Sequence, residues 1–218
     1  NLPLAALGAF ILWFGWFGFN PGSTLSGMDS NIARIAVNTN LSAAAGGTVA
    51  ALLTLFMYGK ADLSMAINGA LGGLVAITAG CAFVTPLSAL FIGTVAGGLI
   101  IGAVPFFDRL HADDPVGAIA VHGVCGTFGT LAVGVFAQNG GLFYGGGLHL
   151  LGVQVLGVAV IGLWGFGTTY GLFRVLKATV GIRVTKEDEI IGLDLSEHGI
   201  AAYNDLEYPL MQGAAQPF

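Results

Sequence analysis

The chain has 218 residues, of which 55% are hydrophobic and only 9% charged, and its mean hydropathy is +0.83. Soluble domains carry about 25% charged residues, so this composition indicates an integral membrane protein, with a soluble all-helical core as the alternative. The net charge of −5 and the lack of a basic cluster exclude a nucleic-acid partner. The apolar residues form long runs, which predicts an all-α membrane protein in preference to a barrel.

Six apolar runs of helical length follow one another along the chain. The first, residues 3–19, is rich in aromatic residues and ends at the turn-forming sequence NPGS from Asn20. The second, residues 31–58, carries Arg34 near its start. The third and fourth, residues 63–84 and 87–107, contain small residues that let helix backbones approach closely: Gly69, Gly72, Gly73 and Gly80 in one, and Gly93, Gly97, Gly98 and Gly102 in the other.

The fifth run, residues 115–137, contains His122, and the sixth covers residues 148–175. Asp114 is predicted to cap the fifth helix, with Pro115 in its first position. A rise of about 1.5 Å per residue then places His122 about 12 Å along the helix, near the middle of a hydrocarbon layer about 30 Å thick. The sequence therefore predicts a transmembrane domain, residues 1–177, and a polar, acidic tail, residues 178–218.

Basic residues fall unevenly on the two sides of such a six-span arrangement. One side has only Arg34. Because Lys and Arg are concentrated in cytoplasmic loops, the other side is predicted to be cytoplasmic, together with the C-terminal tail. Residues 19–23 then lie at the outer face of the cell membrane. The basic residues of the cytoplasmic side are Lys60, Arg109, Arg174, Lys177, Arg183 and Lys186.

His122 is an ionisable residue inside an apolar run, and its helical face is made of small residues: Ala118, Gly126 and Gly129. One interpretation is that His122 lines a pathway for a small molecule, since ionisable groups within a membrane usually face a cavity or a partner. The other is a packing role, in which a second helix backbone fills the space and His122 hydrogen-bonds a neighbouring carbonyl. Spacing alone leaves both open.

Aromatic and hydroxyl groups gather where the first run ends. Trp16, Phe19 and Ser23 would form a vestibule suited to a cation, because aromatic faces attract positive charge and a hydroxyl accepts a hydrogen bond. The alternative is an interfacial belt of aromatic side chains. The pattern by itself favours the belt.

Three further patterns concern a possible hydrolase, the cysteines and a possible metal site. An intramembrane hydrolase would pair His122 with Ser64 or Ser88, but no nucleophile motif is present. The cysteines lack metal or disulfide spacing and are predicted to pack in the core: Cys81 and Cys125. The tail contains potential metal ligands, although a solvated or docked tail is the favoured interpretation: Asp194, Glu197 and His198.

Three segments resemble the ammonium transporter (Amt/Mep/Rh) family. They are GWFGFNPGS from Gly15, the DDP and VHGVCG elements around His122, and VGIRVTKEDEIIGLDLSEHGIAAY from Val180. The resemblance implies the second half of an eleven-helix fold, helices six to eleven plus the cytoplasmic tail, which is the second of two inverted repeats. Since the sequence begins at Asn1 without a Met, a fragment is expected, and the first repeat lies outside it.

The resemblance also implies roles for residues of the first run. Phe19 is similar to one of two stacked gating phenylalanines, and Ser23 to the hydroxyl of an outer ammonium recruitment site. Trp16 and Leu12 would lie on the pore side of the same helix. The second gating phenylalanine would belong to the first repeat.

Within the fifth run, His122 resembles the second of two paired pore histidines, and Ala118 a pore-lining position one turn below it. The first histidine of the pair would belong to the first repeat. Many members of the family have an Asp three residues after the position of Asp114, where this chain has Gly117. A network that uses that carboxylate is not expected here.

The function implied is ammonium or ammonia transport by a homotrimer with a pore in each subunit, without enzymatic activity, cofactor or metal. An ammonium sensor that signals through its tail is the alternative. The resemblance further implies that the tail contacts neighbouring subunits and carries inhibition by a PII-type nitrogen regulator. The tail residues in question are Gly192, Leu193, Asp194, His198, Gly199 and Tyr203.

Overall fold

The computed structural model describes residues 1–203, and the regular structure within them is helical. In this part of the chain, five helices are long and apolar enough to cross a membrane, while α3 (Leu63–Thr78) is shorter. The predicted all-α membrane class is confirmed. The five are α1 (Leu2–Phe19) with the 3-10 turn η1 (Pro21–Thr24), α2 (Ile32–Tyr58), α4 (Pro86–Arg109), the π-helical turn η2 (Ile119–Val124) with α5 (Cys125–Phe136), and α6 (His149–Thr179).

The chain divides into two compact units within α6. The first, Asn1–Leu163, holds α1 to α5, the 3-10 turn η3 (Leu142–Tyr144) and the start of α6. The second begins at Trp164 and contains the rest of α6 with two short tail helices, α7 (Lys186–Ile191) and α8 (Leu193–Ser196). The predicted domain boundary after residue 177 stays a prediction, and residues 204–218 of the predicted tail lie outside the described residues.

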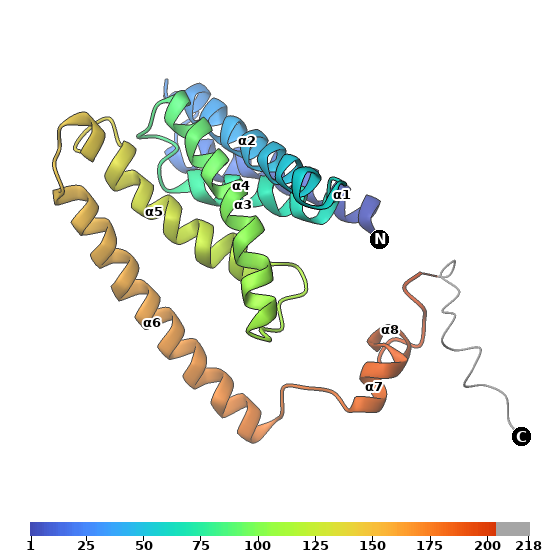
Figure 1. Cartoon of the computed structure of the whole chain (residues 1–218). Helices are drawn as coiled ribbons and strands as arrows, with labels where there is room; N and C mark the ends of the chain where they lie inside the picture. Colours follow the sequence, from blue (N-terminus) through green and yellow to red (C-terminus); the bar gives the residue numbers. More distant parts are fainter. Residues whose placement is uncertain (204–218) are drawn as a thin grey trace, which may run out of the picture. The chain divides into compact units, whose positions relative to one another are not determined.

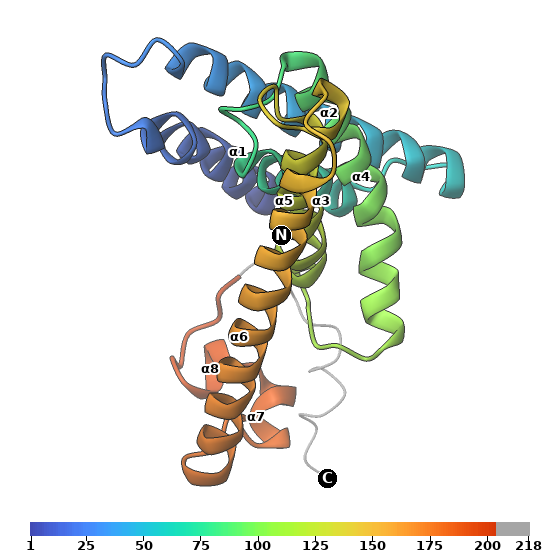
Figure 2. The ribbon, with the colours of Figure 1, turned by 90° about the vertical axis from the view of Figure 1, so that its left-hand side faces the viewer.

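In the first unit, α3 is flanked by α2, α4 and α5 (Figures 1 and 2). A Cβ atom at Gly73 or Gly93 would collide with the carbonyl oxygen of Ser42, so these backbones touch where only glycine fits. Ser42 Oγ donates to the Gly73 carbonyl at 2.7 Å. The predicted close approach of backbones is confirmed at Gly69, Gly73, Gly93 and Gly97. Gly72 and Gly80 face side chains instead, and Gly98 and Gly102 face open space within residues 1–203.

Helix α3 ends at Thr78, six residues before the predicted end of the third run. The chain then continues to Val84 through turns that bury Gly80, Cys81 and Val84 but leave Phe83 exposed. Asn38 of α2 satisfies two of the freed carbonyls, because its Nδ2 donates to Cys81 O at 2.9 Å and to Val84 O at 3.0 Å. Non-helical backbone is tolerated at membrane depth only where protein groups satisfy it in this way. The prediction failed here because the turn keeps apolar side chains.

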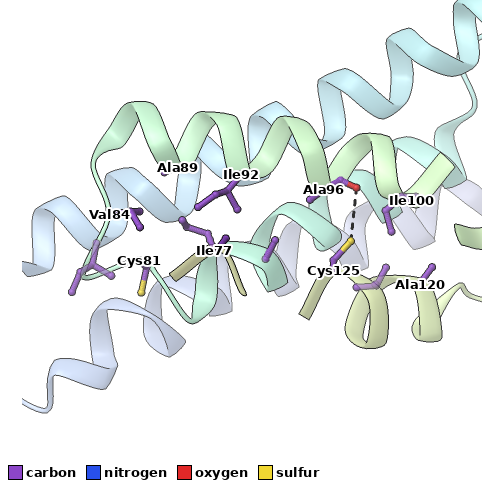
Figure 3. Close-up of a cluster of buried hydrophobic side chains, with 13 residues drawn as sticks. Ile77, Cys81, Val84, Ala89, Ile92, Ala96, Ile100, Ala120 and Cys125 are labelled. Atoms are coloured by element: carbon purple, nitrogen blue, oxygen red, sulfur yellow. Dashed lines mark hydrogen bonds between the residues drawn. The ribbon is translucent and has the colours of Figure 1, made fainter. Parts of the chain in front are cut away.

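Apolar side chains from α3, α4 and the His122 helix form the core of this unit (Figure 3). Both cysteines belong to it, with Cys125 fully buried and Cys81 7% exposed. The Cys125 thiol points at the Ala96 carbonyl of α4, with an S···O distance of 3.8 Å. The predicted packing role of the cysteines is confirmed.

The His122 helix begins later than predicted. Residues 115–117 form a turn that ends at Gly117, whose φ of 75° lies in the left-handed region. Asp114 still caps the helix, but from further back: its two carboxylate oxygens accept from the N–H groups of Ala118 and Ile119, each at 2.8 Å. His122 therefore lies in the π-helical first turns of the helix. The depth of His122 counted along a helix from Asp114 stays a prediction, although the first residues of that count, 115–117, are not helical.

Helices α1 and α6 have no buried residue within the described chain. They are apolar nonetheless, with many large side chains exposed along their length. Helix α6 also runs to Thr179, four residues beyond the predicted sixth run. Such helices need lipid or further protein around them, because soluble chains rarely leave continuous apolar faces exposed.

Candidate functional site

His122 faces an open groove of the first unit. Its side chain is exposed and makes no hydrogen bond with any residue from 1 to 203, so the carbonyl partner that the packing interpretation requires is absent from this part of the chain. The imidazole lines two hollows at once. One hollow, of about 490 Å³, also has Leu12 and Ala118 in its wall, and the other, of about 390 Å³, has Trp16 and Phe19. We call these the central and aromatic hollows.

The small-residue face of the His122 helix serves both interpretations. A Cβ atom at Gly129 would collide with the backbone of Ala76, so the α3 backbone fills the space on that turn. At Gly126 there is ordinary room for a Cβ, and this residue lines the aromatic hollow beside His122. The packing interpretation therefore describes Gly129, whereas His122 and Ala118 face the groove.

Trp16 is held in place by Thr78, at the end of α3. The indole Nε1–H donates to Thr78 Oγ1 at 2.9 Å, and that hydroxyl donates to the Leu74 carbonyl at 2.7 Å. Phe19 packs edge-on against Trp16, with ring centroids 5.9 Å apart and planes inclined by 63°. Thr78 was not predicted from the sequence. The available signal was that a half-buried tryptophan usually finds a partner for its N–H.

Ser23 lies in η1, one turn beyond Phe19. Its hydroxyl donates to the Phe19 carbonyl, so the lone pairs of Oγ stay available to an incoming donor. The turn is fixed to α2 by Asn20, which is 3% exposed and donates from Nδ2 to Thr39 Oγ1 at 3.0 Å. Ser23 is exposed and does not itself line the two hollows around His122.

A third hollow, of about 330 Å³, continues the groove away from the aromatic rings. Its wall contains two carboxylates, Asp108 and Asp114, with Ser64 and Asn68 from α3. We call it the acidic hollow. It shares wall residues with the central hollow, Asn68 among them. Asn68 was not predicted as a site residue from the sequence, although a lone amide in the apolar run of α3 was a signal that could have indicated it.

Within residues 1–203, no arrangement of side chains matches the hydrolase or the metal site considered from the sequence. Ser88 bonds with Thr85 at 2.9 Å, and Ser64 lines the acidic hollow, which His122 does not reach. Neither serine pairs with the histidine as a hydrolase would need. In the same part of the chain, no group of three or more His, Cys, Asp or Glu side chains is placed to hold a metal ion.

The second unit contains the predicted tail residues in a short capped segment. Thr185 Oγ1 accepts from the Asp188 N–H at 3.2 Å and so caps α7. Asp194 Oδ2 accepts from the Ala202 N–H at 2.9 Å and Oδ1 from the Leu195 N–H at 3.0 Å. These bonds, the Ala202 one first, hold the pKa of Asp194 below its ordinary value. The same segment contains Gly192 and Gly199, both with positive φ, and Leu193, His198 and Tyr203.

Long apolar helices around a groove that holds a histidine, two aromatic rings and few polar groups define a multi-pass membrane protein with a pathway-like site. Residues 1–203 match the model of the Ammonium Transporter Family. The chain belongs to that family.

Relatives match the chain over nearly all of its length. It is 46% identical to "Ammonium transporter Amt2" of Archaeoglobus fulgidus over 93% of this chain and 46% of that protein. It is 39% identical to "Ammonium transporter 1 member 1" of Arabidopsis thaliana, with the same two coverages. The chain thus spans about half the length of these curated relatives.

Solved structures give the same result. The chain superposes on a structure named "Sensor Amt Protein" with a TM-score of 0.84 and 46% identity, covering 90% of this chain and 49% of that one. For Mep2 of Candida albicans the TM-score is 0.81 and the identity 30%, covering 90% and 46%. The fold of the ammonium transporters is therefore the fold of this chain.

Proposed function

We propose that the His122 groove is one wall of a conduit that carries ammonium, as ammonia, across a cell membrane. The opposite wall comes from the half of the protein that the relatives have and this sequence does not cover, as the first of two inverted repeats. Two observations support this division. The chain covers 46% of the Archaeoglobus fulgidus relative, and α1, which supplies wall residues to both hollows around His122, has no buried residue within the described chain.

The aromatic end of the groove recruits the cation. Moving a bare ammonium ion into an apolar passage costs tens of kcal/mol by solvation arguments, whereas neutral ammonia loses only its hydrogen bonds. The faces of Trp16 and Phe19 attract the cation, and Ser23 Oγ accepts one of its N–H groups because the hydroxyl hydrogen is engaged with Phe19 O. Transfer of a proton from the ammonium ion to water at this end leaves neutral ammonia and removes most of the transfer cost.

His122 then serves the neutral molecule in the apolar part of the groove. A neutral imidazole has one N–H donor and one ring nitrogen that accepts, so it exchanges hydrogen bonds with ammonia without a net charge. Leu12 and Ala118 supply the apolar wall beside it. The second histidine of the pair is contributed by the other repeat.

The observation that carries this proposal is that His122 lines both the aromatic and the central hollow. The test is ammonium uptake by the complete protein in liposomes, with His122→Ala and Phe19→Ala compared with the wild type. Both variants should change the flux while the protein remains folded. The matched control is His149→Ala, at the exposed start of α6 and outside these hollows, which should transport like the wild type. Unchanged flux in both groove variants would contradict the proposed roles.

A sensor is the second candidate function, because one of the similar structures is named "Sensor Amt Protein". A sensor binds ammonium at the same aromatic end but moves little of it. Ammonium-dependent current across liposomes, measured beside ammonium binding, separates the two: binding without current would favour the sensor.

The remaining features of the proposal concern assembly and regulation. The protein forms a homotrimer with one conduit per subunit, and its tail, with the Asp194 segment, lies on the cytoplasmic side and receives a PII-type regulator. A pull-down with such a regulator at varied ATP, ADP and 2-oxoglutarate tests the last point. Absence of binding under every condition would remove the regulator.

A further inference from the structure

Asn68 is a polar residue that the proposed function leaves without a role. It lies on α3 in the sequence Ala66-Ile67-Asn68-Gly69, where its neighbours are apolar or small. The side chain is half-buried, and its amide makes no hydrogen bond with any residue from 1 to 203. An amide left without partners in an apolar setting costs free energy, so its presence calls for a ligand or a partner.

The position of Asn68 in the groove indicates a ligand. In the wall of the central hollow, among the described residues, Asn68 and His122 are the two polar side chains, and the remaining lining is apolar. Asn68 also lines the acidic hollow together with Asp108 and Asp114. It therefore stands between the histidine and the carboxylate-lined end of the groove, where a molecule leaving His122 passes next.

Gly117 explains how the amide reaches this position. A Cβ atom on Gly117 would lie 2.8 Å from Asn68 Nδ2 and 3.3 Å from Val104 Cγ2, and the glycine has φ of 75°. The Asn68 amide thus fills the space that a side chain at residue 117 would take. Any larger residue there pushes the amide away and also strains the turn.

We propose that Asn68 is a second substrate-contacting residue of the conduit, which receives ammonia from His122 and releases it into the acidic hollow. The inference rests on the proposed function. Nδ2–H donates to the ammonia lone pair and Oδ1 accepts an ammonia N–H, so the amide replaces part of the lost hydration without adding a charge. No proton or bond changes hands at this residue, and the amide has the same character at every working pH.

The test is a size-matched pair of variants in the complete protein, Asn68→Ser and Asn68→Ala, assayed for ammonium uptake in liposomes. Both shorten the side chain, but only serine keeps a hydroxyl that donates and accepts. Since one hydrogen bond is worth about 1 kcal/mol, Asn68→Ala should have a Vmax about fivefold below that of Asn68→Ser. The KM for ammonium, which is set at the aromatic end, should stay that of the wild type in both.

Gly117 provides a second, independent test. Gly117→Ala should lower Vmax. Gly123→Ala on the His122 helix, where an added Cβ would meet only Ile119 Cγ2, at 3.7 Å, among residues 1–203, should not. In the double variant Asn68→Ala/Gly117→Ala the loss should be smaller than the product of the single losses, because both remove the same contact.

The outcomes distinguish a failure of the Asn68 role from a failure of the proposed function. Equal Vmax values for the serine and alanine variants, in a protein whose wild type transports and whose His122→Ala variant does not, would overturn the role of Asn68 alone. No uptake by the wild type would overturn the proposed function, and the role of Asn68 with it. If the melting temperatures of both Asn68 variants fall together with their transport rates, Asn68 is a packing residue and the inference is wrong.

Discussion

The two sides of α3 are built in opposite ways. Towards α2, its glycines place backbone against backbone, with Gly73 against the Ser42 carbonyl and no room for a side chain. Towards α1 and the His122 helix, it presents Asn68 and Thr78 to open hollows. The glycine side of α3 therefore sets the spacing of the helices, while the side that faces the hollows presents polar groups to a small molecule. Substitutions on the first side should cost stability, and those on the second should cost flux.

The largest effect is expected at Gly93 of α4, which contacts the α2 backbone on the packed side. Gly93→Ala drives a methyl group into the Ser42 carbonyl and should destabilise the protein by about 3 kcal/mol, the upper range for overpacking a tight contact. Thermal unfolding of the complete protein in detergent measures this. Gly98→Ala is the matched control on the same helix, since nothing lies within 4 Å of its added Cβ in residues 1–203. Equal melting temperatures for both variants would refute the packed interface.

A smaller loss of stability is expected from Asn38→Leu, which removes the amide that bonds the carbonyls of Cys81 and Val84. Two buried carbonyls then lose a donor, at about 1 to 3 kcal/mol each, but the substitution also removes the buried Asn38 Oδ1, which has no partner within the described chain. A net loss of about 2 kcal/mol follows. Asn40→Leu, at an exposed position of the same helix, is the control. A melting temperature like that of the control would show that the turn after α3 does not need Asn38.

On the groove side, the bond between Trp16 and Thr78 should affect flux more than stability. Thr78→Val removes the acceptor and Trp16→Phe removes the donor, and each costs about 1 kcal/mol of folding free energy at most. Both free the aromatic pair from α3, so uptake should fall several-fold in each. The double variant should transport no worse than the poorer single one, because the two side chains act as one unit. Multiplied losses would contradict this link.

The sequence predicted the helices of the fold well and their ends poorly. Long apolar runs predict helices reliably because hydropathy is a property of side chains. The end of α3 depends instead on hydrogen bonds to the backbone, in which Asn38 donates to the carbonyls of Cys81 and Val84. The start of the His122 helix likewise depends on the positive φ of Gly117. Neither signal is visible in composition or periodicity.

The candidate site was predicted in part. His122 stood out because an ionisable residue in an apolar run is unusual. Trp16 and Phe19 stood out as aromatic residues at the end of the first run, and the resemblance to a family favoured a pore role for them over an interfacial belt. The structure places both in the wall of a hollow that His122 also lines. Thr78 and Asn68 escaped notice. Trp16 and Thr78 are 62 residues apart in the sequence, and only the folded arrangement of α1 and α3 makes them partners.

The smallest expected effect lies in the tail segment around Asp194, which belongs to the second unit. The Asp194 carboxylate is half-buried and accepts from the N–H groups of Ala202 and Leu195, with His198 adding a favourable charge, so its pKa is lowered. A lowered carboxyl pKa stabilises the folded segment fully above the unfolded value, about 3.9, and this contribution is lost as pH falls through the lower folded value.

Amide hydrogen exchange of residues 192–203, expressed as protection relative to an unfolded peptide, should therefore stay constant from neutral pH down to about 4 and fall below it. Asp194→Asn should show reduced protection at neutral pH and no such fall, whereas the exposed control Glu197→Gln should follow the wild type. A fall in protection that began already near neutral pH would contradict the role of the Asp194 carboxylate, because a carboxyl group with a lowered pKa stays ionised well above pH 4.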